Sequence, residues 1–209
     1  RGQRGRRFES YLGRLDSMKV LIIATPRSGS TVLCHALAKE LRFKAIQEPF
    51  NTFIIKYFGN GKPLIDLNKE LQDNIVVKSM VHSHTDKDFA SRFDKTILLS
   101  RKNRMLAEES WDFQKRHGRK GLGWHSRYVH DGKPVSKQTI ESFDYFYDEM
   151  AKVSKNLNLP IFWYEDIFSN NEDKINKFIK ELDLEINFHT FNRYINTENR
   201  YRKIEKTIL

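Results

Sequence analysis

The segment TPRSGST at 25–31 combines the residue types that hold phosphate groups in proteins. It follows an apolar run, MKVLIIA, and precedes leucines at helical spacing. A strand, a Gly/Ser turn and a helix together point backbone N–H groups at an anion, and the helix dipole adds positive potential. Arg27 supplies a fixed charge, Gly29 permits close approach of the backbone, and the hydroxyls of Ser30 and Thr31 are further donors. The sequence therefore predicts an anion site at this turn.

The turn is not the Walker A loop of ATP-binding and GTP-binding proteins. That loop reads GxxxxGK[ST], and its lysine reaches the β- and γ-phosphates. No such lysine precedes Ser30 or Thr31. The turn instead resembles the 5′-phosphosulfate loop of sulfotransferases that use 3′-phosphoadenosine-5′-phosphosulfate (PAPS), and most of all the bacterial and viral carbohydrate sulfotransferases. The resemblance implies that five residues hold the phosphosulfate: Arg27, Ser28, Gly29, Ser30 and Thr31.

A second motif of that family follows the apolar run TILLS. Arg101 comes directly after this run, and Ser110 lies nine residues further on, with a predicted helix between them. The resemblance implies that this pair holds the 3′-phosphate of the nucleotide. The residue types suit that role, because a guanidinium offers paired donors to phosphate and a hydroxyl adds another. An Arg and a Ser at this spacing are common by chance. The motif supports the resemblance only because it follows the 25–31 turn in the chain and has the expected strand before it.

Three side chains are candidates for the transfer chemistry. The resemblance implies that Glu48, in QEPFN, is the general base, as a glutamate is in several carbohydrate-type members. Lys78, in IVVKSMV, can neutralise the transferring sulfonate or position the acceptor, although a strand-end lysine that reaches solvent is an equal alternative. His82 is the reserve base, since cytosolic sulfotransferases use a histidine. A polar strand end is the simpler interpretation of His82.

The resemblance implies in-line transfer from PAPS to an acceptor hydroxyl or amine, with no metal required. A carbohydrate or glycolipid is the leading hypothesis for the acceptor, and 118–134 is a candidate acceptor-binding loop. FWYEDIF resembles a "YEDL" strand end of the family. Arg200, Arg202 and Lys203 either close over the nucleotide or lie on a solvated helix face.

The elements that must position these residues alternate between strands and helices. The apolar runs predict strands at 18–24, 75–81, 95–100 and 161–164. The helical patterns cover 31–41, 103–117, 138–157 and 172–182. Alternating strands and helices predict an α/β fold, a single P-loop-like domain with a central, mostly parallel sheet flanked by helices.

Composition limits the class of protein. The chain has 209 residues, 39% of them hydrophobic, which suits one compact domain. We expect the domain to span 18–209. Residues 1–17 are Arg- and Gly-rich and look foreign to the fold: either a disordered basic arm, or an extension read from an upstream tRNA gene, because Arg7 to Ser10 back-translates to a T-arm sequence. The net charge of +10 fits an anionic partner without choosing one.

The single cysteine, Cys34, excludes an intrachain disulfide framework and favours a reducing compartment. With no apolar run of spanning length we expect no membrane insertion and a cytoplasmic protein. Two other functions stay open. One is a P-loop nucleotide kinase or NTPase, which the missing lysine disfavours. The other is a non-catalytic basic protein that binds nucleotide or nucleic acid, although basic residues do not concentrate in one helix and we expect no nucleic-acid partner.

Overall fold

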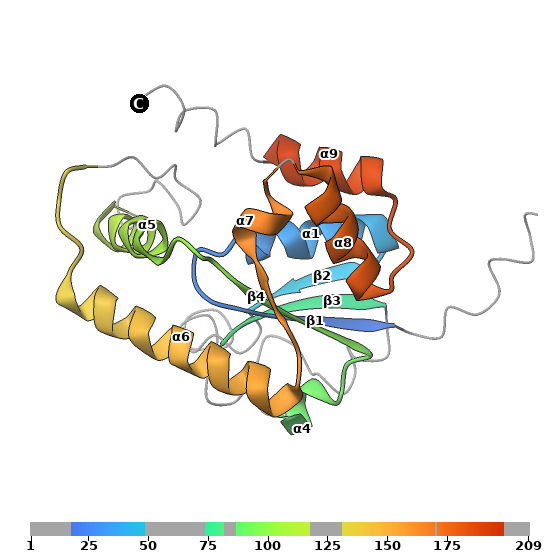
Figure 1. Cartoon of the computed structure of the whole chain (residues 1–209), viewed down its shortest axis with the longest axis horizontal. Coiled ribbons are helices and arrows are strands. Elements are labelled where there is room, and N and C mark those ends of the chain that lie inside the picture. Colours follow the sequence, from blue (N-terminus) through green and yellow to red (C-terminus); the bar gives the residue numbers. More distant parts are fainter. Residues whose placement is uncertain (1–17, 49–73, 82–86, 118–130, 170, 199–209) are drawn as a thin grey trace, which may run out of the picture.

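A parallel β-sheet forms the centre of the molecule. The computed structural model describes residues 18–48, 74–81, 87–117, 131–169 and 171–198. Within these ranges five strands, all parallel, lie in the order β2-β3-β1-β4-β5 (Figure 1). They are β1 (Lys19–Ala24), β2 (Lys44–Gln47), β3 (Ile75–Met80), β4 (Lys95–Ser100) and β5 (Ile161–Trp163). The predicted α/β class with a central parallel sheet is confirmed.

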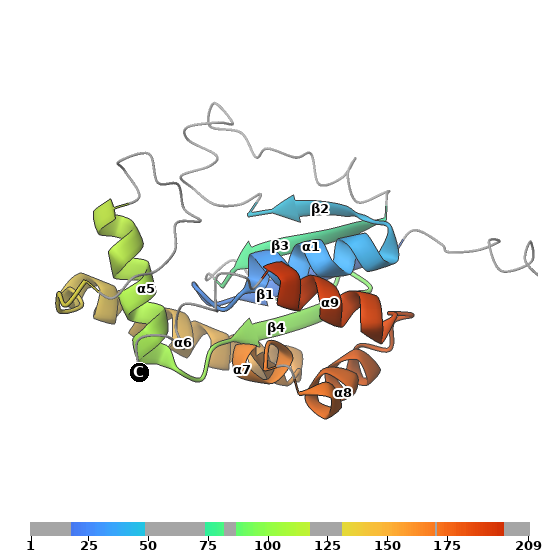
Figure 2. The same ribbon diagram turned by 90° about the horizontal axis from the view of Figure 1, so that it is seen from above.

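Helices cover both faces of this sheet. Their bounds are α1 (Ser30–Leu41), α4 (Lys87–Ala90), α5 (Arg104–His117), α6 (Lys137–Leu157), α7 (Tyr164–Ile167), α8 (Glu172–Leu182) and α9 (Phe188–Glu198). Figure 1 shows α1, α8 and α9 on one face, with α4 and α6 on the other. Seen from above in Figure 2, the strand arrowheads point toward the end of the molecule where α5 lies. No helix within the described ranges has the length and apolar character to cross a bilayer.

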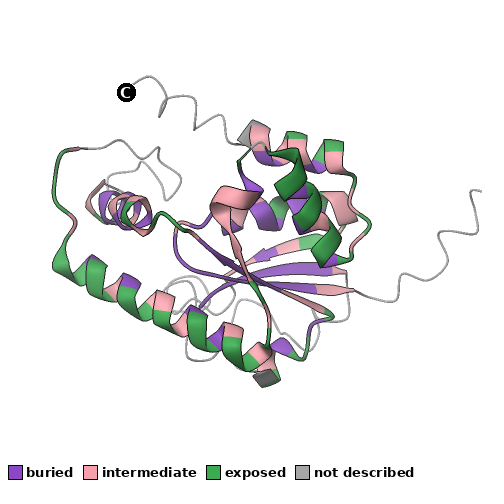
Figure 3. Cartoon of the chain, viewed as in Figure 1, coloured by how far each residue is buried: buried purple, intermediate pink, exposed green. Residues whose placement is uncertain are grey.

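β1 lies in the middle of the sheet and is almost wholly buried, as its unbroken apolar sequence predicts. Because side chains alternate along a strand, it contributes to two cores. Val20, Ile22 and Ala24 pack with α1, α8 and α9, whereas Leu21 and Ile23 pack with α6. Figure 3 shows the same division, since the inner stripes of the helices are buried and their outer stripes are exposed.

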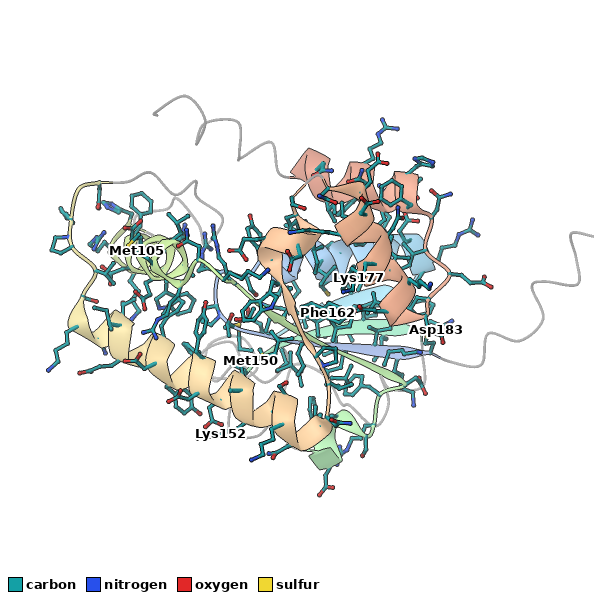
Figure 4. All side chains as sticks on the ribbon, in the orientation of Figure 1. Met105, Met150, Lys152, Phe162, Lys177 and Asp183 are labelled. Carbon is teal, nitrogen blue, oxygen red and sulfur yellow. The ribbon has the colours of Figure 1, made fainter. Side chains whose placement is uncertain are left out.

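The long helix α6 covers its face of the sheet with one apolar stripe. Met150 reaches from this stripe toward the sheet and is 1% exposed, while Lys152 points away (Figure 4). The helical pattern at 138–157 predicts Ile140, Phe143 and Val153 on this stripe, and the last two are buried. The prediction for Ile140 is wrong, since its side chain is 40% exposed.

Each predicted strand and helix agrees with the structure to within one residue at each end. The described residues also contain four elements that the sequence did not indicate. These are β2, α4, α7 and α9. β2 is a four-residue edge strand in which only Ile46 is buried, so it lacks the apolar run of β1. The predicted strand at 161–164 ends at Trp163, and Tyr164 begins α7. The predicted N-terminal extension, 1–17, lies outside the described residues.

A buried carboxylate fixes α5 against the start of α6. Asp112 is 3% exposed and its Oδ1 accepts hydrogen bonds of 2.6 Å from the hydroxyls of Ser136 and Thr139. Its Oδ2 pairs with Arg116, one turn along α5. Arg116 in turn donates to both oxygens of Asp131, at 3.0 and 3.2 Å. The orientation of α5 therefore depends on ionised Asp112.

Burial acts to raise the pKa of the Asp112 carboxyl, but the hydrogen bonds from Ser136 and Thr139 and the charge of Arg116 outweigh it. They lower that pKa below its ordinary value of 3.8. A carboxyl whose pKa is lower in the folded state stabilises the fold above its unfolded pKa. That stabilisation is lost as the pH falls through the folded-state pKa.

We predict that Asp112→Asn lowers the free energy of unfolding at pH 7 by about 2–4 kcal/mol, since it leaves buried donors and Arg116 poorly paired. The difference from the unaltered protein should shrink below about pH 4, where the carboxyl begins to protonate in the unfolded chain, and should be lost once the pH falls below the folded-state pKa. Urea denaturation followed by circular dichroism measures both. Asp148→Asn, an exposed carboxylate on α6, is the control and should change little. A deficit that is the same at pH 3 and pH 7 would contradict the role given to the charge.

Candidate functional site

The carboxyl ends of β1 and β4 form a switch point in the topology. After β1 the chain crosses to the β2 side of the sheet, whereas after β4 it crosses to the β5 side. Open α/β sheets bind ligands outside the strand ends at such a point. The two ends are joined there: Thr25 N donates to Leu99 O at 3.1 Å, and the hydroxyls of Thr25 and Ser100 are 3.1 Å apart. The predicted anion turn follows β1 at this point.

The turn at 25–31 is held by its own backbone. Arg27 and Gly29 both have left-handed backbone angles, with φ of 60° and 76°. The buried hydroxyl of Ser28 donates to Thr25 O at 2.8 Å. The Ser28 side chain therefore shapes the turn, and contact with a ligand is left to its backbone. α1 begins at Ser30 with no acidic residue in its first turn, so its positive end meets no carboxylate there.

Two arginines lie together at this turn. The Nε of Arg27 donates to the hydroxyl of Ser110, on α5, at 2.8 Å. Burial lowers the pKa of the Arg27 guanidinium, and the nearby positive charge of Arg101 lowers it further. Within the part of the chain that the structure describes, no carboxylate forms an ion pair with Arg27. Two guanidiniums this close are stabilised when an anion lies between them.

Arg101 is held by an aromatic ring and a carboxylate. Its guanidinium carbon lies 4.6 Å from the centre of the Tyr164 ring, and its side chain is 14% exposed. The Nε of Arg101 is buried and has no hydrogen-bond acceptor among the described residues. The nearest carboxylate oxygen, on Glu165, is 3.7 Å away. The structure thus brings Arg27, Arg101 and Ser110 together.

Tyr164 also packs against the turn, and the sequence analysis gave it no role. A Cβ atom at Gly29 would lie 2.8 Å from its ring and 2.9 Å from that of Phe168. Gly29 is therefore required both for its left-handed φ and for the space that Tyr164 occupies. The YED motif after an apolar run was the sequence signal that could have indicated a role for Tyr164. The motif alone does not show which turn Tyr164 packs against.

The predicted catalytic residues Glu48 and Lys78 form an ion pair, with Glu48 directly after β2 and Lys78 within β3, two residues before its end. The N–H of Glu48 also donates to Lys78 O at 2.7 Å. Lys78 is 4% exposed, so the alternative of a lysine that reaches solvent is wrong. Burial among apolar residues raises the pKa of the neighbouring Cys34 thiol to about 12, although the charge of Lys78 acts to lower it. Cys34 is a packed core residue and not a nucleophile.

The site residues form two groups along one edge of the sheet. Glu48 and Lys78 come from β2 and β3, whereas Arg101 and Ser110 come from β4 and α5, and β1, whose turn carries Arg27, lies between β3 and β4. Ser30 is buried and Thr31 is partly exposed at the start of α1. His82, the reserve base, lies outside the described residues, as do most of the 118–134 loop and the basic cluster at 200–203.

Comparisons with known protein families, with curated proteins and with solved structures found no match for this chain. The resemblance of its motifs to sulfotransferase motifs therefore stays a prediction. The functional argument rests on the geometry at the ends of β1 and β4.

We predict that Gly29→Ala lowers the free energy of unfolding by about 2–4 kcal/mol, through backbone strain and the clash with Tyr164. Gly132→Ala is the matched control. Gly132 has a similar φ of 68°, but a Cβ there meets nothing within 4 Å. Its cost should be about 1 kcal/mol, from the backbone alone. Urea titrations of both variants measure the difference, and equal costs would show that Tyr164 does not pack on the turn as described.

Proposed function

We propose that this protein is a PAPS-dependent sulfotransferase that moves a sulfuryl group to an acceptor hydroxyl or amine, with a carbohydrate or glycolipid as the acceptor. One observation carries the proposal: the arginine of the first motif donates a hydrogen bond to the serine of the second. Residues 83 positions apart in the sequence meet at the switch point of the sheet. A single nucleotide with phosphates at both ends can therefore contact both motifs.

The residues present suit such a donor. Arg27 and the N–H groups at the start of α1 would hold the 5′-phosphosulfate, by charge and by the helix dipole. Arg101 and Ser110 would hold the 3′-phosphate, and the buried Nε of Arg101 is a donor with no acceptor among the described residues. Since a buried donor without a partner costs free energy, an anion there stabilises the site.

In the transfer step, the acceptor oxygen bonds to sulfur while the bond from sulfur to the bridging oxygen of PAPS breaks. The products are a sulfate ester, or a sulfamate from an amine, and 3′-phosphoadenosine 5′-phosphate (PAP). Glu48 would take the acceptor proton as general base. Its ion pair with Lys78 holds the carboxylate in place, and its side chain is 22% exposed, so an acceptor can reach it.

The alternatives predict different ligands. A nucleotide kinase or NTPase would bind ATP with Mg²⁺, whereas the turn at 25–31 lacks the lysine that reaches the β- and γ-phosphates. A nucleic-acid-binding protein would bind polynucleotide with a steep dependence on salt. A non-catalytic family member would bind PAP and transfer nothing.

We predict that the protein binds PAP with equal affinity in Mg²⁺ and in EDTA, and that Arg27→Ala weakens this binding by about 10–100-fold through the lost charge-assisted contacts. Isothermal titration calorimetry measures both. Arg92→Ala is the matched control, since Arg92 is exposed and lies in the turn before β4, at the opposite edge of the sheet. Binding of ATP with Mg²⁺ in preference to PAP would overturn the proposal.

We further predict that Glu48→Gln lowers sulfuryl transfer from labelled PAPS by about 10²–10⁴-fold, because the base is lost. PAP affinity should stay within about twofold, as the carboxylate makes no nucleotide contact in this scheme. Single-turnover assays against a panel of sugars, glycolipids, phenols and amines supply the rates. Glu185→Gln, an exposed carboxylate, is the control. Unchanged transfer by Glu48→Gln would reject its role as the base.

A further inference from the structure

The segment that joins β4 to α5 carries Arg101 and sets the direction of the helix that carries Ser110. In the parallel pairing of β4 and β5, Ser100 is opposite Trp163. β5 ends at Trp163, and Tyr164 and Glu165 begin α7 directly after it. Tyr164 and Glu165, the first two residues of the YED motif, therefore lie beside the segment that joins β4 to α5.

The Glu165 carboxylate contacts three consecutive residues of the segment. One oxygen accepts the N–H of Lys102 at 2.8 Å. The other accepts the N–H of Asn103 at 3.0 Å and lies 3.7 Å from the Nε of Arg101. Hydrogen bonds from backbone N–H groups to a carboxylate are stronger than those between neutral groups. Glu165 therefore fixes the backbone from which the Arg101 side chain leaves the sheet.

The same carboxylate fixes the start of α5. Asn103 Oδ1 accepts the N–H of Leu106 at 3.1 Å and so caps the helix. Glu165 binds the N–H of that capping residue, and its negative charge lies at the positive end of the helix dipole. Because Ser110 lies on this helix, one side chain of α7 holds both Arg101 and the element that carries Ser110.

Glu165 orients Arg101 without satisfying its donors. A separation of 3.7 Å exceeds a hydrogen bond, and the Arg101 Nε has no acceptor among the residues that the structure describes. The Tyr164 ring covers the guanidinium at 4.6 Å. An arginine held by a ring and a nearby charge, with a buried donor left over, is preorganised for an external anion.

We propose that Glu165 is a positioning residue that, by holding Arg101 and the start of α5, determines the preference for a nucleotide with a 3′-phosphate. The proposal rests on the proposed function, because it assigns Arg101 and Ser110 to that phosphate. Glu165 touches no ligand in this scheme and acts through Arg101 and Ser110.

The test compares PAP with adenosine 5′-phosphate, which lacks the 3′-phosphate. The ratio of their two dissociation constants in one protein measures the preference, and a merely structural loss of active protein does not move that ratio. We expect Glu165→Gln to reduce the ratio by about 10-fold or more, chiefly through weaker PAP binding. Glu165→Asp keeps the charge and should recover part of the preference.

Asp166→Asn is the matched control. Asp166 is the next residue of α7, has a similar exposure (30% against 32% for Glu165), and pairs with the side chains of Lys102 and Lys174 rather than with the backbone near Arg101. Its substitution removes the same charge and should leave the ratio within about twofold. If Glu165→Gln does not fold, the Glu165→Asp variant is compared with Asp166→Asn by the same ratio.

The outcomes separate the two proposals. If the unaltered protein does not prefer PAP to adenosine 5′-phosphate, the proposed function fails, and this inference with it. If the unaltered protein prefers PAP and Glu165→Gln keeps the full preference, the inference alone is overturned. A reduced ratio in Glu165→Gln, with an unchanged ratio in Asp166→Asn, supports the positioning role.

Discussion

Two like charges held close together are the constraint on which the candidate site depends. Arg27 and Arg101 repel each other at the ends of β1 and β4, and burial weakens the screening that water would provide. The fold keeps them there with two neutral contacts, the hydroxyl of Ser110 for Arg27 and the ring of Tyr164 for Arg101, and with the Glu165 carboxylate, 3.7 Å from the Nε of Arg101. One carboxylate does not balance two guanidinium charges. The arrangement leaves a local excess of positive charge, and an anion is the ligand that relieves it.

The rest of the fold supplies the rigidity that this repulsion requires. β1 is buried on both faces, so the turn that follows it starts from a fixed strand end. The backbone of Arg101 is also held, because the hydroxyl of Tyr147 on α6 donates to the carbonyl oxygen of Arg101 at 2.5 Å. α5 is fixed at two levels, by Glu165 at its start and by Asp112 toward its other end. Both supports are carboxylates that accept several hydrogen bonds, so their geometry is specific as well as strong.

The second group of polar residues, Glu48 and Lys78, differs in character from the arginine pair. Here a buried cation has a carboxylate partner, and the two charges offset one another. A balanced ion pair beside a site with an excess of positive charge suits a division of roles. The arginines would hold an anionic donor, while the ion pair would handle the proton of an acceptor. The shared edge of the sheet makes this division possible, because all five strands end on the same side.

The sequence by itself determined the class of fold and the place of the turn at 25–31, between a buried strand and a helix. Unbroken apolar runs such as β1 and strong helical stripes such as that of α6 predict their elements, because burial alone specifies them. Short elements such as β2 and α7 were not predicted, because contacts with residues distant in the chain determine their conformation. The tertiary structure alone decided that Arg27 meets Ser110, that Tyr164 needs the space at Gly29, and that Lys78 is buried against Glu48. Those contacts join residues up to 135 positions apart (Gly29 and Tyr164), and strand order and register, which local sequence does not encode, determine which of them meet.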